Sequence, residues 1–127
     1  RWWRRLAPAG GLTQMGASHV VLKPGAWSSQ RHWHRDEDEL LVMISGEAVL
    51  VEDGGRTVIR AGDVCAWRKG AENGHHLINE READSVFVAI SAGDANGSGS
   101  YPDIDMTFDA RGYHHKDGRP YPAQRPG

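Results

Sequence analysis

Cysteine is nearly absent from this sequence: among 127 residues, Cys65 is the only one. A lone thiol excludes a disulfide within the chain and is compatible with a reducing compartment, so we expect a cytoplasmic protein in which Cys65 is buried and inert. Long apolar runs are missing as well. No stretch approaches the roughly 18 apolar residues of a membrane-spanning helix, and the opening residues lack the apolar core of about 7–15 residues that a secretory signal needs.

The chain also has little excess charge. Its formal net charge is −2 and charged residues make up 25% of it, ordinary values for a globular protein. The basic cluster formed by Arg1, Arg4 and Arg5 is too short to indicate a polyanion as partner. The composition therefore predicts neither nucleic acid nor an acidic membrane surface as a binding partner.

Sustained helical periodicity is absent from every window, and short apolar runs between turn residues take its place. The 16 glycines and 6 prolines are spread along the whole length, a pattern typical of many strands joined by tight turns. The run 39–45 is continuously apolar, as expected for a strand that is buried on both faces. We expect an all-β sandwich or closed barrel with strands at 18–23, 30–34, 39–45, 47–52, 56–60, 64–67, 75–79 and 84–91.

The length fits one domain that spans residues 1–127. We expect a barrel core over about 18–91 and a flexible linker over about 92–100, which is rich in Gly and Ser. The segment 101–127 carries several aromatic residues and prolines. It is expected to form an extended C-terminal arm over the barrel or over a neighbouring subunit; the alternative is a mostly disordered tail.

Six of the seven histidines fall in close pairs, and one pair has the spacing of metal ligands. His32 and His34 project from the same face of a strand, because successive side chains alternate. Glu39 follows after a corner, and His75 can approach from the opposite wall. Three imidazoles and one carboxylate suit a divalent first-row ion and leave room for water or substrate. The alternative interpretation is a chance His-x-His pair beside a solvated acidic loop.

The spacing of the surrounding glycines favours the metal site. Gly25, the pair His32 and His34, Glu39 and Gly46 closely resemble the first conserved motif of the cupin superfamily. The resemblance covers about 18–91 and implies a cupin double-stranded β-helix, also called a jelly-roll barrel. It also implies that the residues matching cupin metal ligands bind one divalent ion inside the barrel; these are His32, His34, Glu39 and His75.

The second cupin motif is looser, and it leaves the fourth ligand open. It resembles the segment that contains Gly62-Asp63, Gly70, His75 and Asn79. Cupins usually have Pro where this chain has Arg68, and two extra residues precede His75. His75 and His76 alternate across a strand, so only one of them faces the interior. The spacing to Asn79 favours His75, with His76 then a surface or supporting residue.

Within the cupins, the chain looks most like small bacterial single-domain proteins of largely unassigned function. The segments that carry this resemblance are GAWSSQRHWH (25–34), NGHHLIN (73–79), YPDID (101–105) and HKDGRPYP (115–122). Three further expectations follow from strand alternation and composition. Trp33 should face outward, Met43 should lie in the core, and His114 and His115 should be either tail residues or a cover for the barrel mouth.

The expected ligand set limits the chemistry. Three neutral imidazoles and one carboxylate leave a net charge of about +1 on a divalent ion, enough to polarise a carbonyl or acidify a water. Fe or Mn would suit a dioxygenase, and Zn or Ni an isomerase or lyase. We therefore expect a metal-dependent enzyme acting on a small oxygenated molecule, with no catalytic residue evident beyond the ligands. The alternatives are a non-catalytic ligand-binding or sensing protein, or an assembly module. A homodimer is expected because cupins often pair through sheet edges.

Overall fold

The structure, a computed structural model, describes residues 1–122. Within this range the chain forms β-strands and no α-helix, which confirms the all-β class. The strands are β1 (Trp2–Arg5), β2 (Gly16–Leu22), β3 (Trp33–His34), β4 (Glu37–Ser45), β5 (Glu47–Glu52), β6 (Gly55–Arg60), β7 (Val64–Trp67), β8 (His76–Ile78), β9 (Ser85–Gly93), β10 (Gly99–Tyr101), β11 (Met106–Asp109) and β12 (Gly112–His114). No helix in the described part is therefore long and apolar enough to cross a membrane.

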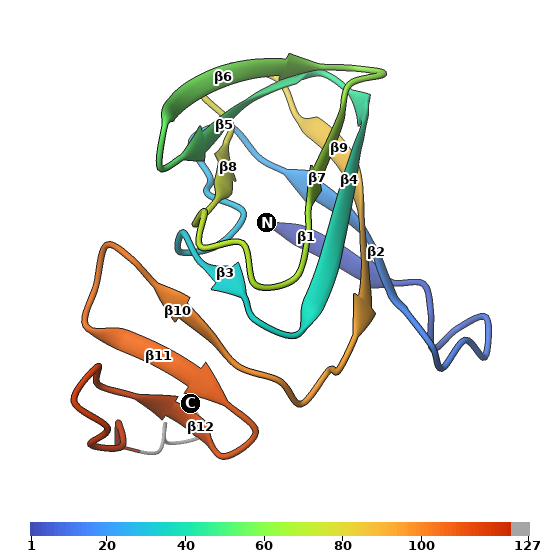
Figure 1. Ribbon diagram of the computed structural model, residues 1–127. Helices are drawn as coiled ribbons and strands as arrows, with labels where there is room; N and C mark the ends of the chain where they lie inside the picture. Colours follow the sequence, from blue (N-terminus) through green and yellow to red (C-terminus); the bar gives the residue numbers. More distant parts are fainter. Residues whose placement is uncertain (123–127) are drawn as a thin grey trace.

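Two antiparallel sheets face each other and enclose the interior of a barrel (Figure 1). One sheet has the strand order β1-β2-β9-β4-β7, and the other has the order β6-β5-β8. The turn at residues 53–55 joins β5 to β6, and Gly55 there has a φ of 132°, a value that side-chain-bearing residues rarely adopt. The predicted barrel is thus present, and its core residues are Val20, Leu22, Leu41, Met43, Ala48, Leu50, Ile59, Trp67, Leu77 and Phe87.

Strand β4 is buried on one face, so the expectation of burial on both faces was wrong. Leu41 and Met43 are 6% and 1% exposed, whereas Leu40 and Ile44 are 37% and 50% exposed. Side chains alternate along a strand, and one face of an antiparallel sheet can meet water. The expectation that Met43 lies in the core is confirmed.

Strand β1 was not among the expected strands. It pairs antiparallel with β2 at the edge of the five-stranded sheet, beginning with Trp2 opposite Val21 and ending with Arg5 opposite Ser18. Trp2 is 70% exposed and Trp3 is 52% exposed. A short edge strand with basic residues and little burial has no alternating hydrophobic pattern, which is why the sequence did not reveal it.

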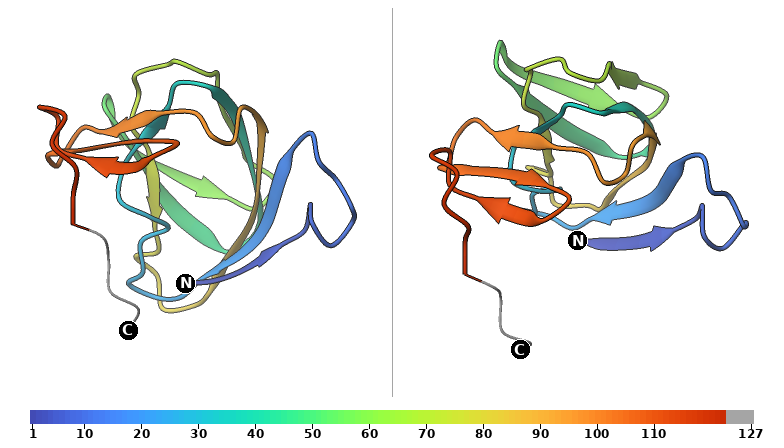
Figure 2. Two further views of the ribbon diagram at one scale, coloured as in Figure 1. Left: turned by 90° about the horizontal axis from the view of Figure 1, so that it is seen from below. Right: turned by 60° about the horizontal axis from the view of Figure 1, so that its bottom comes forward.

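The C-terminal segment forms a third, antiparallel sheet beside the open end of the barrel, in the order β12-β11-β10-β3 (Figure 2). It joins the barrel through β3, where Gly99 pairs with His34 and Ser100 with Trp33. Residues 94–98 separate β9 from β10, so four residues of the expected linker, at 92, 93, 99 and 100, are part of strands. Residues 123–127 of the expected arm lie outside the described residues.

Trp33 was expected to face outward; it is only 8% exposed, so the side of β3 that carries it is not open to solvent. Its strand is paired with β10, and the guanidinium of Arg35 lies 5.1 Å from the centre of its ring. The sequence pattern correctly separated Trp33 from the neighbouring histidines. It contained no sign that a C-terminal sheet would cover that side of β3.

Candidate metal centre

The structure brings three of the candidate ligands together at the end of β3 and the start of β4. Ligand atoms of His32, His34 and Glu39 all lie within 4.8 Å of one another. His32 and His34 share a direction because they are two residues apart on an extended segment. Glu39 reaches the same point because β4 begins at Glu37, directly after the corner that follows His34.

The fourth candidate, His75, lies against the same carboxylate. Oε1 of Glu39 is 3.1 Å from Nε2 of His34, and Oε2 of Glu39 is 3.0 Å from Nε2 of His75. His75 also pairs with His32 through an antiparallel bridge, and their ring centres are 6.1 Å apart. His75 therefore contacts Glu39 and His32 from the opposite wall, whereas the group whose ligand atoms all lie within 4.8 Å of one another consists of His32, His34 and Glu39.

Backbone oxygens fix the outer nitrogens of two of these rings. Nδ1 of His32 is 2.7 Å from the carbonyl oxygen of Gln30, and Nδ1 of His75 is 3.0 Å from the carbonyl oxygen of Asn73. A carbonyl only accepts, so each Nδ1 carries the proton and donates. Each Nε2 then presents a lone pair, the arrangement in which a histidine binds a metal.

The short contacts of Glu39 fit a shared cation. When Nδ1 of His75 donates to Asn73, the neutral ring has no second proton to give to Glu39 at 3.0 Å. The distances of 3.0 and 3.1 Å place both oxygens of Glu39 against ring nitrogens, so the carboxylate and the two imidazoles could hold one divalent ion between them.

The protonation states agree with this arrangement. Burial lowers the pKa of His32 below its ordinary value, which favours the neutral imidazole. Burial alone would raise the pKa of Glu39, but positive charge on the neighbouring rings of His75, His34 and His32 would outweigh burial and lower that pKa. A neutral imidazole and an ionised carboxylate are the forms that bind metal ions.

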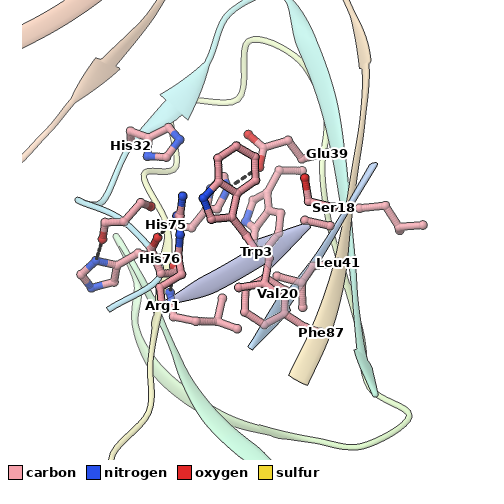
Figure 3. A pocket seen from close by; sticks show the side chains of 16 residues that line it. Arg1, Trp3, Ser18, Val20, His32, Glu39, Leu41, His75, His76 and Phe87 are labelled. Atoms are coloured by element: carbon pink, nitrogen blue, oxygen red, sulfur yellow. Dashed lines mark hydrogen bonds and ion pairs between the residues drawn. The ribbon is translucent and has the colours of Figure 1, made fainter. Parts of the chain in front are cut away.

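His76 occupies the opposite side of the same segment. Its Nδ1 lies 2.9 Å from the carbonyl oxygen of Ser29, and the edge of its ring meets Trp27 at 4.7 Å between centres. Figure 3 shows its ring pointing away from His75. His76 is only 5% exposed, so it is a buried residue, and it lines one edge of the cavity that His75 also lines.

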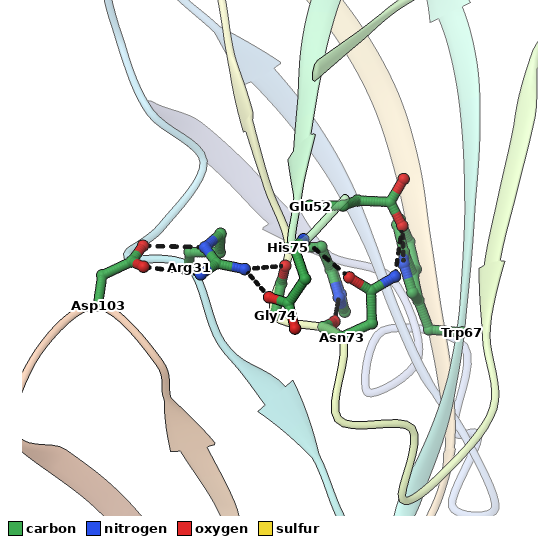
Figure 4. Close-up of polar contacts among 8 residues, drawn as sticks. Arg31, Glu52, Trp67, Asn73, Gly74, His75 and Asp103 are labelled. Carbon is green, nitrogen blue, oxygen red and sulfur yellow. Dashed lines mark hydrogen bonds and ion pairs between the residues drawn. The ribbon is translucent and has the colours of Figure 1, made fainter. Parts of the chain in front are cut away.

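Sequence reasoning missed a group that supports His75 (Figure 4). The indole of Trp67 stacks on the His75 ring, with centres 3.7 Å apart and planes 5° from parallel. Glu52 accepts hydrogen bonds from Trp67 Nε1 at 3.1 Å and from Asn73 Nδ2 at 2.7 Å. Because Asn73 in turn holds His75 through its carbonyl, the group fixes this ring from its face and its edge. The one sign of this group in the sequence was the polar residue Asn73, two residues before His75. Its hydrogen-bond partner Glu52 lies on β5, far away in sequence.

Two cavities adjoin the candidate ligands. The first has a volume of about 260 Å³ and extends into the barrel, with His32, Glu39 and His75 in its lining and Val20, Leu41 and Phe87 on its apolar wall (Figure 3). The second, of about 350 Å³, lies between His32 and His34 on one side and the aromatic residues of the C-terminal sheet on the other. A site with open space beside it and apolar walls is suited to bind one small molecule.

The comparison with protein families agrees with this architecture. The chain forms a small antiparallel barrel with a group of His and Glu side chains in it, and the family described as "Cupin domain" matches residues 18–91. The chain belongs to the cupin family. No curated protein matches the chain at a significant level.

Several solved structures resemble the chain. A sugar phosphate isomerase of the cupin superfamily from Silicibacter pomeroyi is 38% identical, with a TM-score of 0.88 over 95% of this chain and 80% of that chain. A protein from Acidithiobacillus ferrooxidans is 23% identical, with a TM-score of 0.84 over 99% and 81%, a likeness of fold alone. A predicted oxalate decarboxylase from Thermotoga maritima is 26% identical, with a TM-score of 0.62 over 72% and 79%.

Proposed function

We propose that His32, His34, Glu39 and His75 bind one divalent transition metal ion and that the protein is a metal-dependent enzyme acting on a small oxygenated molecule. The observation that carries this proposal is the position of Glu39, whose two oxygens lie 3.1 Å from His34 Nε2 and 3.0 Å from His75 Nε2. Zn, Fe, Mn and Ni are all compatible with three imidazoles and one carboxylate. An ion held there would supply positive charge for polarising a carbonyl or hydroxyl oxygen.

Among the reaction types open to such a site, we propose isomerisation of a sugar phosphate. The sugar phosphate isomerase from Silicibacter pomeroyi is 38% identical to this chain. Its match covers 95% of this chain and so includes most of both segments that flank the barrel, 1–17 and 92–127. An aldose–ketose isomerisation moves a proton between neighbouring carbons and needs no co-substrate. The apolar wall of Val20, Leu41 and Phe87 would limit the access of water to the reacting carbons.

Metal content is the first measurement. Wild type purified without added metal should contain about one equivalent of transition metal by elemental mass spectrometry, and His34→Ala should contain less than a tenth of that amount. His19→Ala is the matched control, because His19 lies on β2 and lines a different cavity. Absence of metal from wild type, with none taken up on titration, contradicts the metal site.

Turnover is the second measurement. Hexose and pentose phosphates are incubated with metal-loaded wild type, and interconversion of aldose and ketose is followed by proton NMR, with exchange of the C–H hydrogen in D₂O as a second readout. Activity should disappear on chelation and return with one metal. Saturable binding without turnover would instead favour a sensing role. Consumption of dioxygen would favour a dioxygenase, and release of carbon dioxide from a carboxylic acid would favour a lyase.

Two further predictions concern the surroundings of the protein. We propose a homodimer, which light scattering would detect as twice the chain mass of 14.0 kDa. We also propose a cytoplasmic location, in line with the single cysteine, and cell fractionation with an antibody against the protein would test it.

A further inference from the structure

The interior cavity contains a set of polar side chains that the metal site does not use. Arg1 and three serines, Ser18, Ser28 and Ser29, line the same cavity as His32, Glu39 and His75. Figure 3 shows Arg1 extending from the start of β1 into the space beside His32 and His75. These side chains all offer hydrogen-bond donors, and donors gathered in one cavity indicate an electron-rich ligand.

Strand β1 determines which basic residue enters this cavity. Successive side chains alternate, so Trp3 and Arg4 project from opposite sides of β1, and Arg1 directly precedes the strand. Arg1 and Trp3 line the interior cavity, whereas Arg4 lines only a separate cavity with Trp2 and His19. Arg1 thus reaches the cavity of the candidate ligands from the position directly before β1.

The guanidinium of Arg1 has no acidic partner within residues 1–122. The ion pairs formed there by arginine involve Arg31, Arg56, Arg60, Arg81, Arg111 and Arg119. Arg1 donates one hydrogen bond, to the carbonyl oxygen of Ser28, and its guanidinium carbon is 5.6 Å from the Trp3 ring centre. With five N–H donors available, most of its donor capacity is free to bind a ligand.

Ser28 adds a donor at the same place. Its Oγ accepts a hydrogen bond of 2.9 Å from the backbone N–H of Leu77. The hydroxyl proton of Ser28 is then free to be donated to a ligand oxygen. Arg1 donates a hydrogen bond to the carbonyl oxygen of Ser28, so the two side chains lie close together. The oxygens of a single ligand group can therefore contact both of them.

The charges of the cavity match a phosphate monoester. Glu39 is the acidic residue among those that line it, and a divalent ion on three neutral imidazoles and Glu39 leaves a charge of about +1. Arg1 raises the total to about +2. A phosphate monoester carries about −1.5 to −2 at neutral pH, whereas a single carboxylate would leave positive charge uncompensated.

We propose that Arg1, with Ser28, forms a subsite for the phosphate group of a phosphorylated substrate whose oxygenated end lies at the metal centre. This inference rests on the proposed function and names the residues that select its substrate class. Arg1 lies outside residues 18–91, the part that matches the cupin family, whereas Ser28 lies within it, so the subsite joins the N-terminal segment to the barrel. An arginine fork suits this role, because it binds phosphate oxygens with two parallel hydrogen bonds.

Calorimetric titration of the zinc-loaded protein tests the subsite, with glucose 6-phosphate, glucose and inorganic phosphate as probes. Arg1→Gln should weaken binding of both phosphate-containing probes by about 10- to 100-fold, the loss expected for hydrogen bonds to a charged group. Binding of glucose itself should change less than about twofold. Arg1→Lys should give an intermediate loss, because it keeps the charge and loses the fork.

Arg4→Gln is the matched control, since it removes the same charge from the same N-terminal segment on the side that faces away from the cavity. Equal weakening by Arg1→Gln and Arg4→Gln would overturn the subsite and indicate a general charge effect. Zinc binding without affinity of wild type for either phosphate probe would overturn the subsite and leave the metal site intact. Failure of wild type to bind zinc would overturn the proposed function itself. Thermal unfolding of each variant confirms that the barrel is folded.

Discussion

The indole ring of Trp67 lies flat against the imidazole of His75, with ring centres 3.7 Å apart and planes 5° from parallel. Trp67 is also the register partner of Glu39 in the pairing of β7 with β4. Trp67 therefore contacts two candidate ligands, His75 through its ring and Glu39 through the backbone of the sheet. The hydrogen bond of 3.1 Å from Trp67 Nε1 to Glu52 prevents the indole from turning. Trp67 therefore acts on the metal centre by positioning His75, without offering a ligand atom itself.

Replacing Trp67 should weaken metal binding although Trp67 offers no ligand atom. In Trp67→Leu the face of His75 loses its support, and the affinity for Zn²⁺ should fall about 10- to 100-fold, as for other residues that orient ligands. Competition with a chromophoric chelator measures this affinity. Trp27→Leu is the comparison, because Trp27 is 52% exposed and touches His76 instead. Equal Zn²⁺ affinity in both variants would contradict the positioning role.

The choice between His75 and His76 can be decided by a pair of variants. His75→Ala should abolish tight Zn²⁺ binding, because it removes the Nε2 that lies 3.0 Å from Glu39. His76→Ala should leave the Zn²⁺ affinity within about threefold and lower the free energy of unfolding by about 1–3 kcal/mol, because Ser29 loses its buried hydrogen-bond partner. Loss of metal in His76→Ala with retention in His75→Ala would reverse the assignment.

Many of the strands and the clustering of His32, His34 and Glu39 could be predicted from the sequence, because both depend on local spacing. His32 and His34 lie two apart on an extended segment, and glycines bound the turns around them, so their shared direction is a property of the chain itself. The same alternation separated His75 from His76. Contacts within a strand and its adjoining turn depend on residues that are close in sequence, so they can be predicted from a single sequence.

Features that depend on distant pairing could not be predicted. The supporting group of Trp67, Glu52 and Asn73 joins three separate segments, and no spacing along the chain connects them. The burial of Trp33 depends on β10, which begins more than sixty residues later. The segment YPDID was recognised as a shared motif, yet its partner Arg31 lies in another motif far from it in sequence.

Arg31 connects the ligand segments to the C-terminal sheet (Figure 4). It donates to Asp103 at 2.9 and 2.7 Å and to the carbonyl oxygen of Gly74 at 2.8 Å, and it also pairs with Asp53. Arg31 precedes His32 and Gly74 precedes His75, so one guanidinium holds both strands and the turn after β10. Arg31→Lys should therefore lower the affinity for Zn²⁺ as well as the melting temperature, because an ammonium cannot replace the planar fork. A change in melting temperature alone would limit Arg31 to a structural role.

The pairing of Asp103 with Arg31 predicts a dependence of stability on acid. The hydrogen bond from Arg31 lowers the pKa of Asp103 below its ordinary value of about 4. A group with a lowered pKa in the folded state stabilises it above the ordinary pKa, and the contribution is lost as the pH falls through the lowered value. The difference in stability between wild type and Asp103→Asn should thus be largest near neutral pH and should shrink below about pH 4. Thermal unfolding at a series of pH values measures it, and a difference that is constant with pH would contradict the assignment.

Gly99 is the point at which the C-terminal sheet meets the metal-site strand, and the space there admits no side chain. A Cβ at this position would lie 2.2 Å from the carbonyl oxygen of Trp33 and 2.3 Å from Cζ of Phe108. One neighbour is backbone and the other is a packed ring, so Gly99→Ala should separate β10 from β3 and cost about 1–3 kcal/mol or more. Because His34 is the register partner of Gly99, the affinity for Zn²⁺ should fall in parallel. Gly54→Ala is the control, since a Cβ at Gly54 meets nothing within 4 Å. Hydrogen exchange of β10–β12 and the Zn²⁺ titration should both change in Gly99→Ala; faster exchange with unchanged affinity would show that the C-terminal sheet and the metal centre are independent.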